Sequence, residues 1–160
     1  MKQIFESDRI SFVEVSELLV MDYLVMVNDI ENVERFLGGA HDPYTEEQEI
    51  DWVRRKLEEK ASVFSMLEKK SGRFIGNIEL MDADDSAGEL GIAITAEKQN
   101  IGYGTEAVSA LTAYGFRHLG LNRIYLRVNP DNARAIHVYE TCGFRAYQRT
   151  DGHICMEILR

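Results

Sequence analysis

The residues best suited to chemistry begin with a glycine-containing run, Gln-Asn-Ile-Gly-Tyr-Gly-Thr at positions 99–105, between a predicted strand and a predicted helix. Glycines at alternate positions, Gly102 and Gly104, let successive backbone N–H groups turn toward one point without clashes from Cβ atoms. The helix that follows directs its unpaired N–H groups and its dipole toward the same point. The run therefore predicts a cradle for a pyrophosphate group, although a plain strand-to-helix turn without a ligand would use the same residues.

A dinucleotide-binding fold of the Rossmann type is a weaker interpretation of the same run. Gly102, Gly104 and Ala107 match its Gly-x-Gly-x-x-Ala pattern. In that fold the glycine loop leaves its strand directly, whereas residues 96–99 intervene here. Only the last 56 of the 160 residues follow Gly104, too few to complete a doubly wound fold. A NAD-binding domain therefore ranks below the other hypotheses.

A second motif, Asn132-x-x-Ala135-x-x-x-Tyr139-x-x-x-Gly143-Phe144, follows an alternating predicted strand. Together with the upstream Gln-x-x-Gly-x-Gly run, it resembles the GNAT superfamily of acetyl-CoA-dependent N-acetyltransferases. The two motifs stand in the family's order, separated by one helix and one strand. Within the superfamily, the chain is most similar to the group of ribosomal-protein N-terminal acetyltransferases and spermidine acetyltransferases.

The resemblance extends over about residues 8–159, but its specific motifs lie within 89–144. One departure is visible, because only residues 145–152 separate Phe144 from the last predicted strand. Relatives often have a longer connection there, which helps to form the acceptor site. The resemblance therefore does not identify the acceptor.

The resemblance implies a definite position for acetyl-CoA. The backbone of Ile92 and Ile94 is expected to pair with the pantetheine arm as if that arm were another strand. Asn132 is expected to contact the arm or to order the loop. Lys98 and Arg134 are candidates for phosphate contacts, or are solvated surface charges. The residues expected to bind the coenzyme are Ile92, Ile94, Gln99, Ile101, Gly102, Tyr103, Gly104, Thr105, Asn132 and Ala135.

Tyr139 is the first catalytic candidate. Acetyl transfer expels a thiolate, which benefits from a proton donor on its departing sulfur. A phenol suits that role, and Tyr139 matches the tyrosine of the family's motif. Its spacing from Ala135 and Cys142 also fits an apolar helix stripe, so simple packing is the alternative.

Two carboxylates are candidates for the acceptor side. An amine is protonated near neutral pH and must lose a proton before it attacks a carbonyl group. Glu89, at the start of a predicted strand, is the candidate base, directly or through a water; the alternative is an exposed strand residue. Glu79, on the neighbouring strand, is expected to attract a cationic acceptor or to act as an alternate base, unless it only faces solvent.

The other reactive residue types predict no competing site. The four histidines have no carboxylate or cysteine partners at ligand spacing, so no metal is expected. No serine lies in a nucleophile-elbow sequence, so serine hydrolase chemistry has no support. Cys142 and Cys155 allow one disulfide at most and fit a reduced cytosolic chain better than a disulfide scaffold.

Apolar periodicity, turn residues and a Thr45-to-Gln48 capping box predict the elements that position these residues. Hairpins in the middle and a later β-α-β unit predict an α/β (α+β mixed) fold with helices on both faces of a mixed sheet. The resemblance adds a splay between the strands at 89–95 and 123–129, which leaves a notch for the thioester. It also makes the helices at 16–27 and 45–60 walls of the acceptor site.

In total we expect one N-acetyltransferase domain over residues 1–160, with a central, splayed sheet of about seven strands flanked by about four helices. The expected strands are 9–15, 63–67, 74–80, 89–95, 123–129, 144–148 and 153–159. The expected helices are 16–27, 45–60, about 105–119, and a last one that is opened by residues 130–132 and closed by Gly143.

The distribution of charged residues indicates which kinds of partner the chain is expected to bind. The chain has 18 Lys and Arg against 27 Asp and Glu, a net charge of -9, which makes a polyphosphate backbone a poor partner and nucleic-acid binding unexpected. Residues 1–97 hold 10 basic and 22 acidic side chains, whereas residues 98–160 hold 8 and 5. Either this is ordinary surface variation, or one half suits a cation and the other an anion.

No membrane segment is predicted. The most apolar run, at 18–27, is interrupted by Asp22 and is about half the roughly 20 residues that a bilayer-spanning helix needs. The N-terminus reaches Asp8 before any apolar core of signal-peptide length. The chain is therefore expected to be soluble and cytoplasmic.

From these features we expect acetyl transfer from acetyl-CoA to a primary amine by direct attack within a ternary complex. The expected acceptors are a polyamine, a peptide or protein N-terminus, or another small cationic amine. The alternative is a non-catalytic acyl-CoA-binding sensor or interaction module, which keeps the glycine loop but needs neither Tyr139 nor Glu89. A homodimer is a further expectation from the resemblance.

Overall fold

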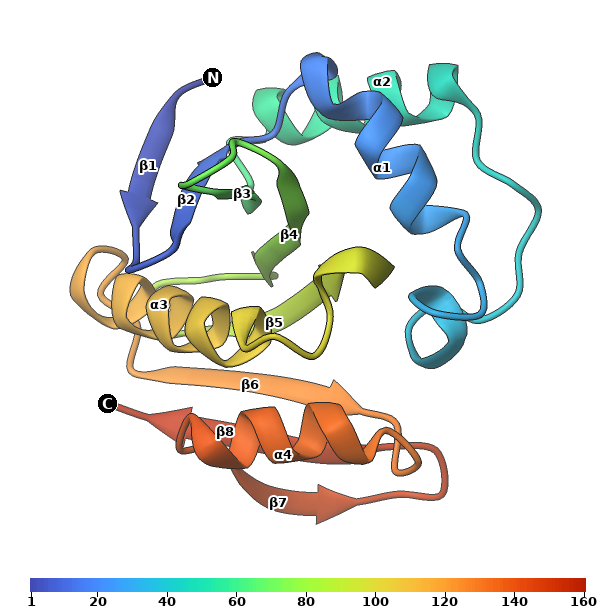
Figure 1. The fold of residues 1–160 in the computed structure, drawn as a ribbon. Helices are drawn as coiled ribbons and strands as arrows, with labels where there is room; N and C mark the ends of the chain where they lie inside the picture. Colours follow the sequence, from blue (N-terminus) through green and yellow to red (C-terminus); the bar gives the residue numbers. More distant parts are fainter.

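The computed structural model describes all 160 residues, and its framework is one eight-stranded mixed sheet with helices on both faces (Figure 1). The strand order is β1-β2-β3-β4-β5-β6-β8-β7, and every neighbouring pair is antiparallel except β5 and β6. The strands are β1 (Gln3–Glu6), β2 (Ile10–Glu14), β3 (Ser62–Glu68), β4 (Phe74–Met81), β5 (Ala87–Ile94), β6 (Arg123–Val128), β7 (Arg145–Arg149) and β8 (Ile154–Leu159).

Four α-helices and three short 3-10 turns connect these strands. The helices are α1 (Val20–Val27), α2 (Glu46–Glu58), α3 (Tyr103–Arg117) and α4 (Ala133–Thr141). The 3-10 turns are η1 (Glu17–Leu19), η2 (Glu34–Phe36) and η3 (Ala96–Lys98). None of the helices combines the length and the apolar character that crossing a bilayer requires.

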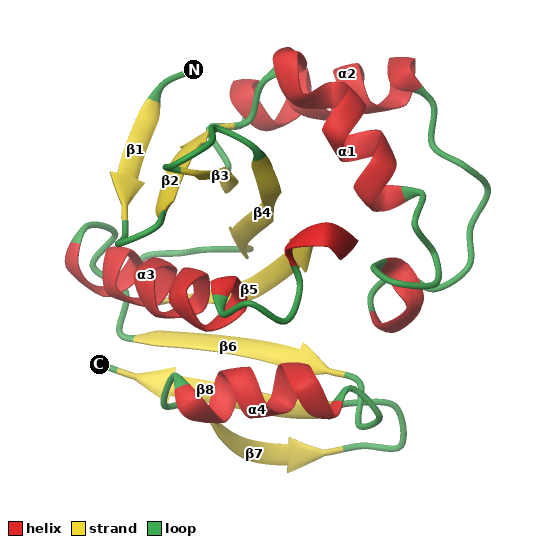
Figure 2. Ribbon diagram, in the orientation of Figure 1, coloured by secondary structure: helices red, strands yellow, loops and turns green.

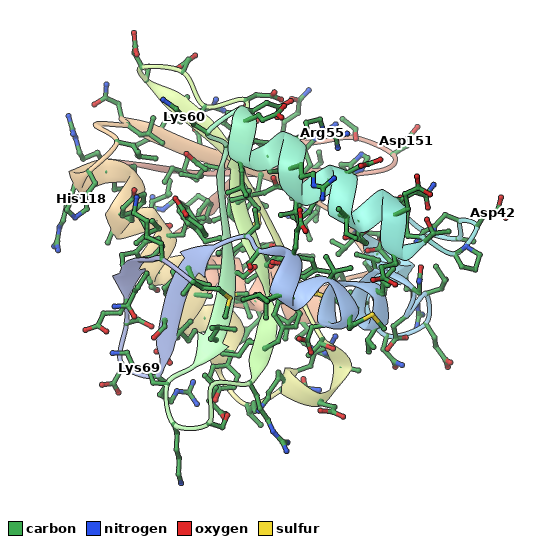
Figure 3. The ribbon with its side chains drawn as sticks, turned by 90° about the horizontal axis from the view of Figure 1, so that it is seen from above. Asp42, Arg55, Lys60, Lys69, His118 and Asp151 are labelled. Atoms are coloured by element: carbon green, nitrogen blue, oxygen red, sulfur yellow. The ribbon has the colours of Figure 1, made fainter.

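Two apolar cores occupy the two faces of the sheet, because successive side chains of a strand point to opposite faces. In β3, Phe64 and Met66 belong to the larger core, which includes residues of α3 and α4. Val63 belongs to the smaller core, which includes residues of α1 and α2. Figure 2 shows α3 beside β5 and α4 beside β6 and β8. Seen from above, α1 and α2 run together across the other side of the sheet (Figure 3).

Local sequence signals account for the helix starts. The reciprocal capping box of Thr45 and Gln48 is formed at the start of α2, as predicted. Asn132 accepts a hydrogen bond from the backbone N–H of Ala135 at 3.2 Å and so caps α4. At the start of the expected helix 16–27, the side chain of Ser16 accepts from the N–H of Leu18 and caps the 3-10 turn η1, which leads into α1.

Two expectations need correction. The sheet has eight strands rather than about seven, because β1 pairs with β2. Strand β1 has only four residues, too few to show a clear alternation of apolar and polar side chains. It is held by contacts outside the strand, since the ring of Phe5 stacks on Phe12 and on Tyr114, with centroid distances of 4.2 Å and 4.4 Å. Helix α3 runs over Tyr103–Arg117 rather than about 105–119, so it begins directly after Gly102.

The parallel contact between β5 and β6 is short. Only three residue pairs join the strands, the last being Glu89 with Tyr125, although β5 continues to Ile94 and β6 to Val128. On its other side β5 remains paired with β4 as far as Ile94. The two strands therefore part at their carboxyl ends, which confirms the expected splay.

The close approach of β4 to the free end of β5 requires a glycine at position 76. A Cβ atom at Gly76 would lie 2.0 Å from the carbonyl oxygen of Ala93 and 2.9 Å from the Cα of Ile94. Both obstacles are backbone atoms, which cannot rotate away. The absence of a side chain at Gly76 thus holds this end of β5 in place.

Gly76→Ala is expected to lower the free energy of unfolding by about 3 kcal/mol, because the methyl group forces the backbones of β4 and β5 apart. Urea unfolding measures the loss. Gly152→Ala is the matched control, since a Cβ atom there meets nothing within 4 Å. Equal stabilities of the two variants would contradict this account of the β4–β5 contact.

Candidate functional site

The start of α3 presents three backbone donors without partners. Gly102 is the N-cap residue, with φ 91° and ψ 0°, a left-handed conformation that suits glycine. No side chain caps this helix, and its first backbone bond runs from the N–H of Glu106 to the carbonyl of Gly102 at 3.3 Å. The N–H groups of Tyr103, Gly104 and Thr105 therefore remain available for a ligand. A helix N-terminus of this kind favours an anion.

A cavity of about 570 Å³ opens beside these donors. The ends of β5, α3 and α4 and the 3-10 turn η2 all contribute residues to its lining. Gly104 leaves room at the helix start, because a Cβ atom there would meet only Ile94 and Val138, at 3.6 Å and beyond. Of the residues singled out by sequence, those lining the cavity are Ile92, Ile94, Lys98, Gln99, Gly102, Gly104, Thr105, Asn132, Arg134, Ala135 and Tyr139.

Two of the expected coenzyme residues do not line this cavity. The side chain of Ile101 is largely exposed, and the ring of Tyr103 is buried on the far side of the loop, where its hydroxyl donates to Glu68. Any contact that Ile101 or Tyr103 makes with a ligand in the cavity therefore comes from the backbone, as the cradle hypothesis requires.

The free end of β5 offers its backbone to the cavity. The N–H of Thr95 donates to the carbonyl of Ile75 at 2.9 Å, which places the odd-numbered residues of this end in the bonds to β4. The polar backbone groups of Ile92 and Ile94 therefore face the gap left by β6. The carbonyl of Ile94 already accepts a hydrogen bond from the side chain of Gln99 at 2.9 Å.

Tyr139 reaches the same cavity from α4 with a nearly buried ring, 8% exposed. Burial, with a smaller contribution from Cys142, raises the pKa of Tyr139 to about 12. The phenol is therefore protonated throughout the physiological pH range. The structure thus gives Tyr139 both a packing role in the larger core and a place on the wall of the cavity.

Glu89 and Glu79 lie on the other face of the sheet. Glu89 alternates with Leu90, which belongs to the core under α3 and α4, so its side chain points toward the α1 and α2 side. It is 8% exposed, and its Oε1 accepts a hydrogen bond from Nε of Arg127 at 2.9 Å. Glu79 lies 3.6 Å from Nζ of Lys56 on α2. Neither carboxylate lines the cavity, so Tyr139 and these two residues flank the split sheet from opposite faces.

Arg9 braces the glycine loop from behind, and sequence reasoning missed it. Its Nη1 donates to the carbonyl of Ile101 at 3.0 Å, and its Nε donates to Glu106 at 2.7 Å. Its guanidinium also lies over the ring of Tyr103, 4.4 Å from the centroid. Some 90 residues separate Arg9 from these partners, so no local pattern could have indicated the contact.

Glu68 is the centre of a second brace. Its carboxylate accepts hydrogen bonds from the hydroxyls of Ser71 and Tyr103 and, at 3.2 Å, from Nζ of Lys98. The two hydroxyls and then the lysine lower the pKa of Glu68 to about 2. Lys98 is thus already paired with a carboxylate, whereas Arg134 donates only to the neutral amide of Gln99, at 3.0 Å. Of the two cations proposed for phosphate contacts, Arg134 is the one whose charge is not neutralised.

Other parts of the molecule combine fewer features of a binding site. A second hollow, of about 630 Å³, lies along α3 beside Cys142 and Arg160, but none of the residues expected to bind a ligand lines it. No group of three or more His, Cys, Asp or Glu side chains is arranged to hold a metal ion. Cys142 and Cys155 are both free thiols.

Comparison with known proteins identifies a matching family model and several curated relatives. The family model described as the acetyltransferase (GNAT) domain matches residues 9–145. The chain is 29% identical over 119 residues to a spermidine N(1)-acetyltransferase of Vibrio cholerae serotype O1, an alignment that covers 72% of this chain and 66% of that protein. Across three of the curated relatives, the alignments span between 60% and 66% of the relative's length.

Solved structures share the whole fold at low sequence identity. A GNAT-family acetyltransferase from Bacillus anthracis superposes with a TM-score of 0.84 at 20% identity, covering 96% of both chains. The spermidine N-acetyltransferase from Vibrio cholerae in complex with CoA and spermine superposes with a TM-score of 0.78 at 21% identity, again covering 96% of both chains. These similarities confirm the expected fold.

The Glu68 brace predicts a pH-dependent contribution to stability. Because the pKa of Glu68 is lowered in the folded state, its ionised form stabilises the fold above the unfolded-state pKa, and this stabilisation is lost as the pH falls toward 2. Glu68→Gln is therefore expected to lower Tm near pH 7, and the difference from the wild type is expected to shrink below about pH 4.5 and to be small only at about pH 2. Scanning calorimetry from pH 7 to about 2 measures this difference in Tm, with the exposed Glu140→Gln as control. A difference that stays constant over this range would contradict the brace.

Proposed function

The chain belongs to the GNAT acetyltransferase family, and on that premise we propose that it transfers the acetyl group of acetyl-CoA to the primary amine of a small cationic acceptor. The reaction is direct: the amine nitrogen bonds to the thioester carbonyl, the carbon–sulfur bond breaks, and CoA leaves as a thiol. Two protein groups assist the reaction, one as a hydrogen-bond donor to the departing sulfur and one as the acceptor of the amine proton.

The observation that carries the proposal is the meeting of uncapped N–H groups and an open strand edge in one cavity. The donors at Tyr103, Gly104 and Thr105 suit the pyrophosphate, and the exposed backbone of Ile92 and Ile94 suits the amides of the pantetheine arm. A volume of about 570 Å³ falls in the range of ordinary ligand sites. Arg134, at the cavity rim, adds a positive charge near the phosphates.

Tyr139 is assigned to the departing sulfur. Its pKa of about 12 lies well above that of an ordinary alkyl thiol, about 8.5, so complete proton transfer would cost about 5 kcal/mol. The phenol therefore acts chiefly as a hydrogen-bond donor that stabilises charge developing on sulfur, and the thiol takes its final proton from solvent. Burial of Tyr139 keeps the donor protonated and strengthens this bond.

Glu89 is assigned to the amine, which approaches from the α1 and α2 side. This direction agrees with the placement of Glu89 on the face opposite Tyr139, next to the point where β5 and β6 part. Arg127 holds one carboxylate oxygen at 2.9 Å, which fixes the side chain and leaves the second oxygen for the proton of an ammonium group or a bridging water.

The charge on that side favours a cationic acceptor, and a polyamine is the first candidate. Glu49 on α2 is 7% exposed, and burial, together with the nearby charge of Glu34, raises its pKa. A bound ammonium group would relieve both effects, because it supplies the missing positive partner. Relatives named spermidine N(1)-acetyltransferase support the same acceptor class.

A direct test is mass-detected acetylation with acetyl-CoA and a panel of spermidine, spermine, peptides with free basic N-termini, and amino antibiotics. We expect spermidine or spermine to gain 42 Da in the presence of the protein, with matching release of CoA thiol. Coenzyme binding without acetylation of any panel member would instead favour the non-catalytic acyl-CoA-binding module.

Tyr139→Phe is expected to lower kcat about 10- to 100-fold, the contribution of one hydrogen bond to a charged group. The dissociation constant of CoA is expected to change less than threefold, because the ring and its packing remain. Steady-state kinetics and calorimetry measure the two quantities. Unchanged turnover would remove Tyr139 from the chemistry.

Glu89→Gln is expected to lower kcat/KM about 100-fold, since an amide cannot accept the proton of the amine. Steady-state kinetics with acetyl-CoA and the acceptor identified by the panel measure kcat/KM. Glu79→Gln is the matched control and is expected to stay within about threefold of the wild type. A large loss in Glu79→Gln with none in Glu89→Gln would make Glu79 the base; no loss in either variant would assign the proton transfer to a water relay.

A further inference from the structure

One wall of the cavity, the segment of residues 30–40, is weakly attached to the rest of the molecule. Internal bonds fold it onto Asp29, whose carbonyl accepts from the N–H groups of Val33 and Glu34 at 3.0 Å. Val33 anchors the segment in the smaller core. Its only hydrogen bond to any residue beyond positions 28–44 is accepted by the carbonyl of Asn32 from Nε2 of Gln99 at 2.9 Å. The position of this wall therefore depends on one side-chain amide and one buried valine.

The amide of Gln99 has three partners from three different elements. Its Nε2 donates to the carbonyls of Asn32 and Ile94, both at 2.9 Å, and its Oε1 accepts from Arg134 at 3.0 Å. Only this orientation is chemically consistent, because two carbonyls need a donor and a guanidinium needs an acceptor. Gln99 thus joins the wall segment, the free end of β5 and the start of α4 immediately before the glycine loop.

We propose that the Gln99 amide is a latch that holds the wall segment over the cavity and couples its position to coenzyme binding. The coupling rests on the proposed function, in which the carbonyl of Ile94 serves the pantetheine arm. A ligand that donates a hydrogen bond to the carbonyl of Ile94 competes with Gln99 for this acceptor. Because the same side-chain nitrogen also donates to the carbonyl of Asn32, the competition acts on the wall segment as well. Gln99, the first residue of the glycine-containing run, is then a positioning residue for the wall of the coenzyme cavity.

The size of the effect follows from the bond that is lost. One neutral hydrogen bond changes a local opening equilibrium about 2- to 10-fold. Amide hydrogen exchange detects such opening, since the N–H groups of Val33 and Glu34 donate to the carbonyl of Asp29, at the base of the segment, and those of Leu37 and Gly39 donate to Glu34. These amides exchange faster whenever the wall opens.

Three variants distinguish the two bonds that Gln99 donates to carbonyl groups from the bond that it accepts from Arg134. Gln99→Leu removes all three bonds. Gln99→Glu keeps an acceptor for Arg134 but can donate to neither carbonyl, and Arg134→Ala leaves both donations intact. In the free protein, exchange at 33–39 is expected to rise about 2- to 10-fold in both Gln99 variants and to stay at the wild-type rate in Arg134→Ala. Tm is expected to change little, because the lost bonds lie at the cavity and not in either core.

CoA supplies the second readout. At CoA concentrations shown by calorimetry to saturate each protein, exchange at 33–39 is expected to change in the wild type and in Arg134→Ala, and to remain unaltered in Gln99→Glu. Arg134→Ala is also expected to bind CoA more weakly, a loss that is independent of the latch.

Two results would overturn the proposal in different ways. Wild-type exchange in both free Gln99 variants would eliminate the latch, whatever the chemistry of the cavity. A CoA-induced change that persists in Gln99→Glu would eliminate the coupling. Failure of the wild type to bind CoA would remove the coupling together with the proposed function, while the exchange of the free variants would still decide the latch.

Discussion

The parallel ladder between β5 and β6 ends after three residue pairs, and the rest of the site depends on that ending. Backbone N–H and C=O groups inside a sheet are costly to leave without partners. The free end of β5 is therefore an internal edge that another chain or an extended ligand can complete. Gly76 keeps β4 close on one side, and the gap on the other side is lined by α3, α4 and the Gln99 amide.

In the proposed reaction, the gap between β5 and β6 lets one sheet receive two kinds of substrate. On the α3 and α4 face, uncapped N–H groups and Arg134 favour an anion, and Tyr139 stands at the wall. On the α1 and α2 face, the buried carboxyl of Glu49 has a raised pKa and no positive partner, which suits a bound cation. Helices α3 and α4 come from the basic part of the sequence, residues 98–160, and helices α1 and α2 come from the acidic part, residues 1–97. In the proposed reaction, separate approach from each face keeps the ammonium group of the acceptor and the pyrophosphate of the coenzyme in different electrostatic environments.

Sequence reasoning predicted the features that local chemistry specifies. The capping box at Thr45, the helix start at residues 130–132 and the alternating strand β6 all have signals within a few residues, and the family resemblance supplied the splay. It missed the bonds from Arg9 to Ile101 and from Gln99 to Asn32, which join residues 92 and 67 positions apart. An arginine or glutamine in isolation predicts only a solvated side chain, and its partner depends on which strands become neighbours. The face that Glu89 occupies and its pairing with Arg127 likewise follow from register, which the sequence leaves open.

The central claim is that the internal edge of β5 and the uncapped start of α3 together bind coenzyme A. Isothermal titration of the folded protein with CoA, and in parallel with NAD, tests it most directly. The account predicts a saturable isotherm with CoA and none with NAD, because the cavity pairs a pyrophosphate site with a groove for an extended amide chain. No saturable binding of CoA, or equal binding of the two, would contradict it.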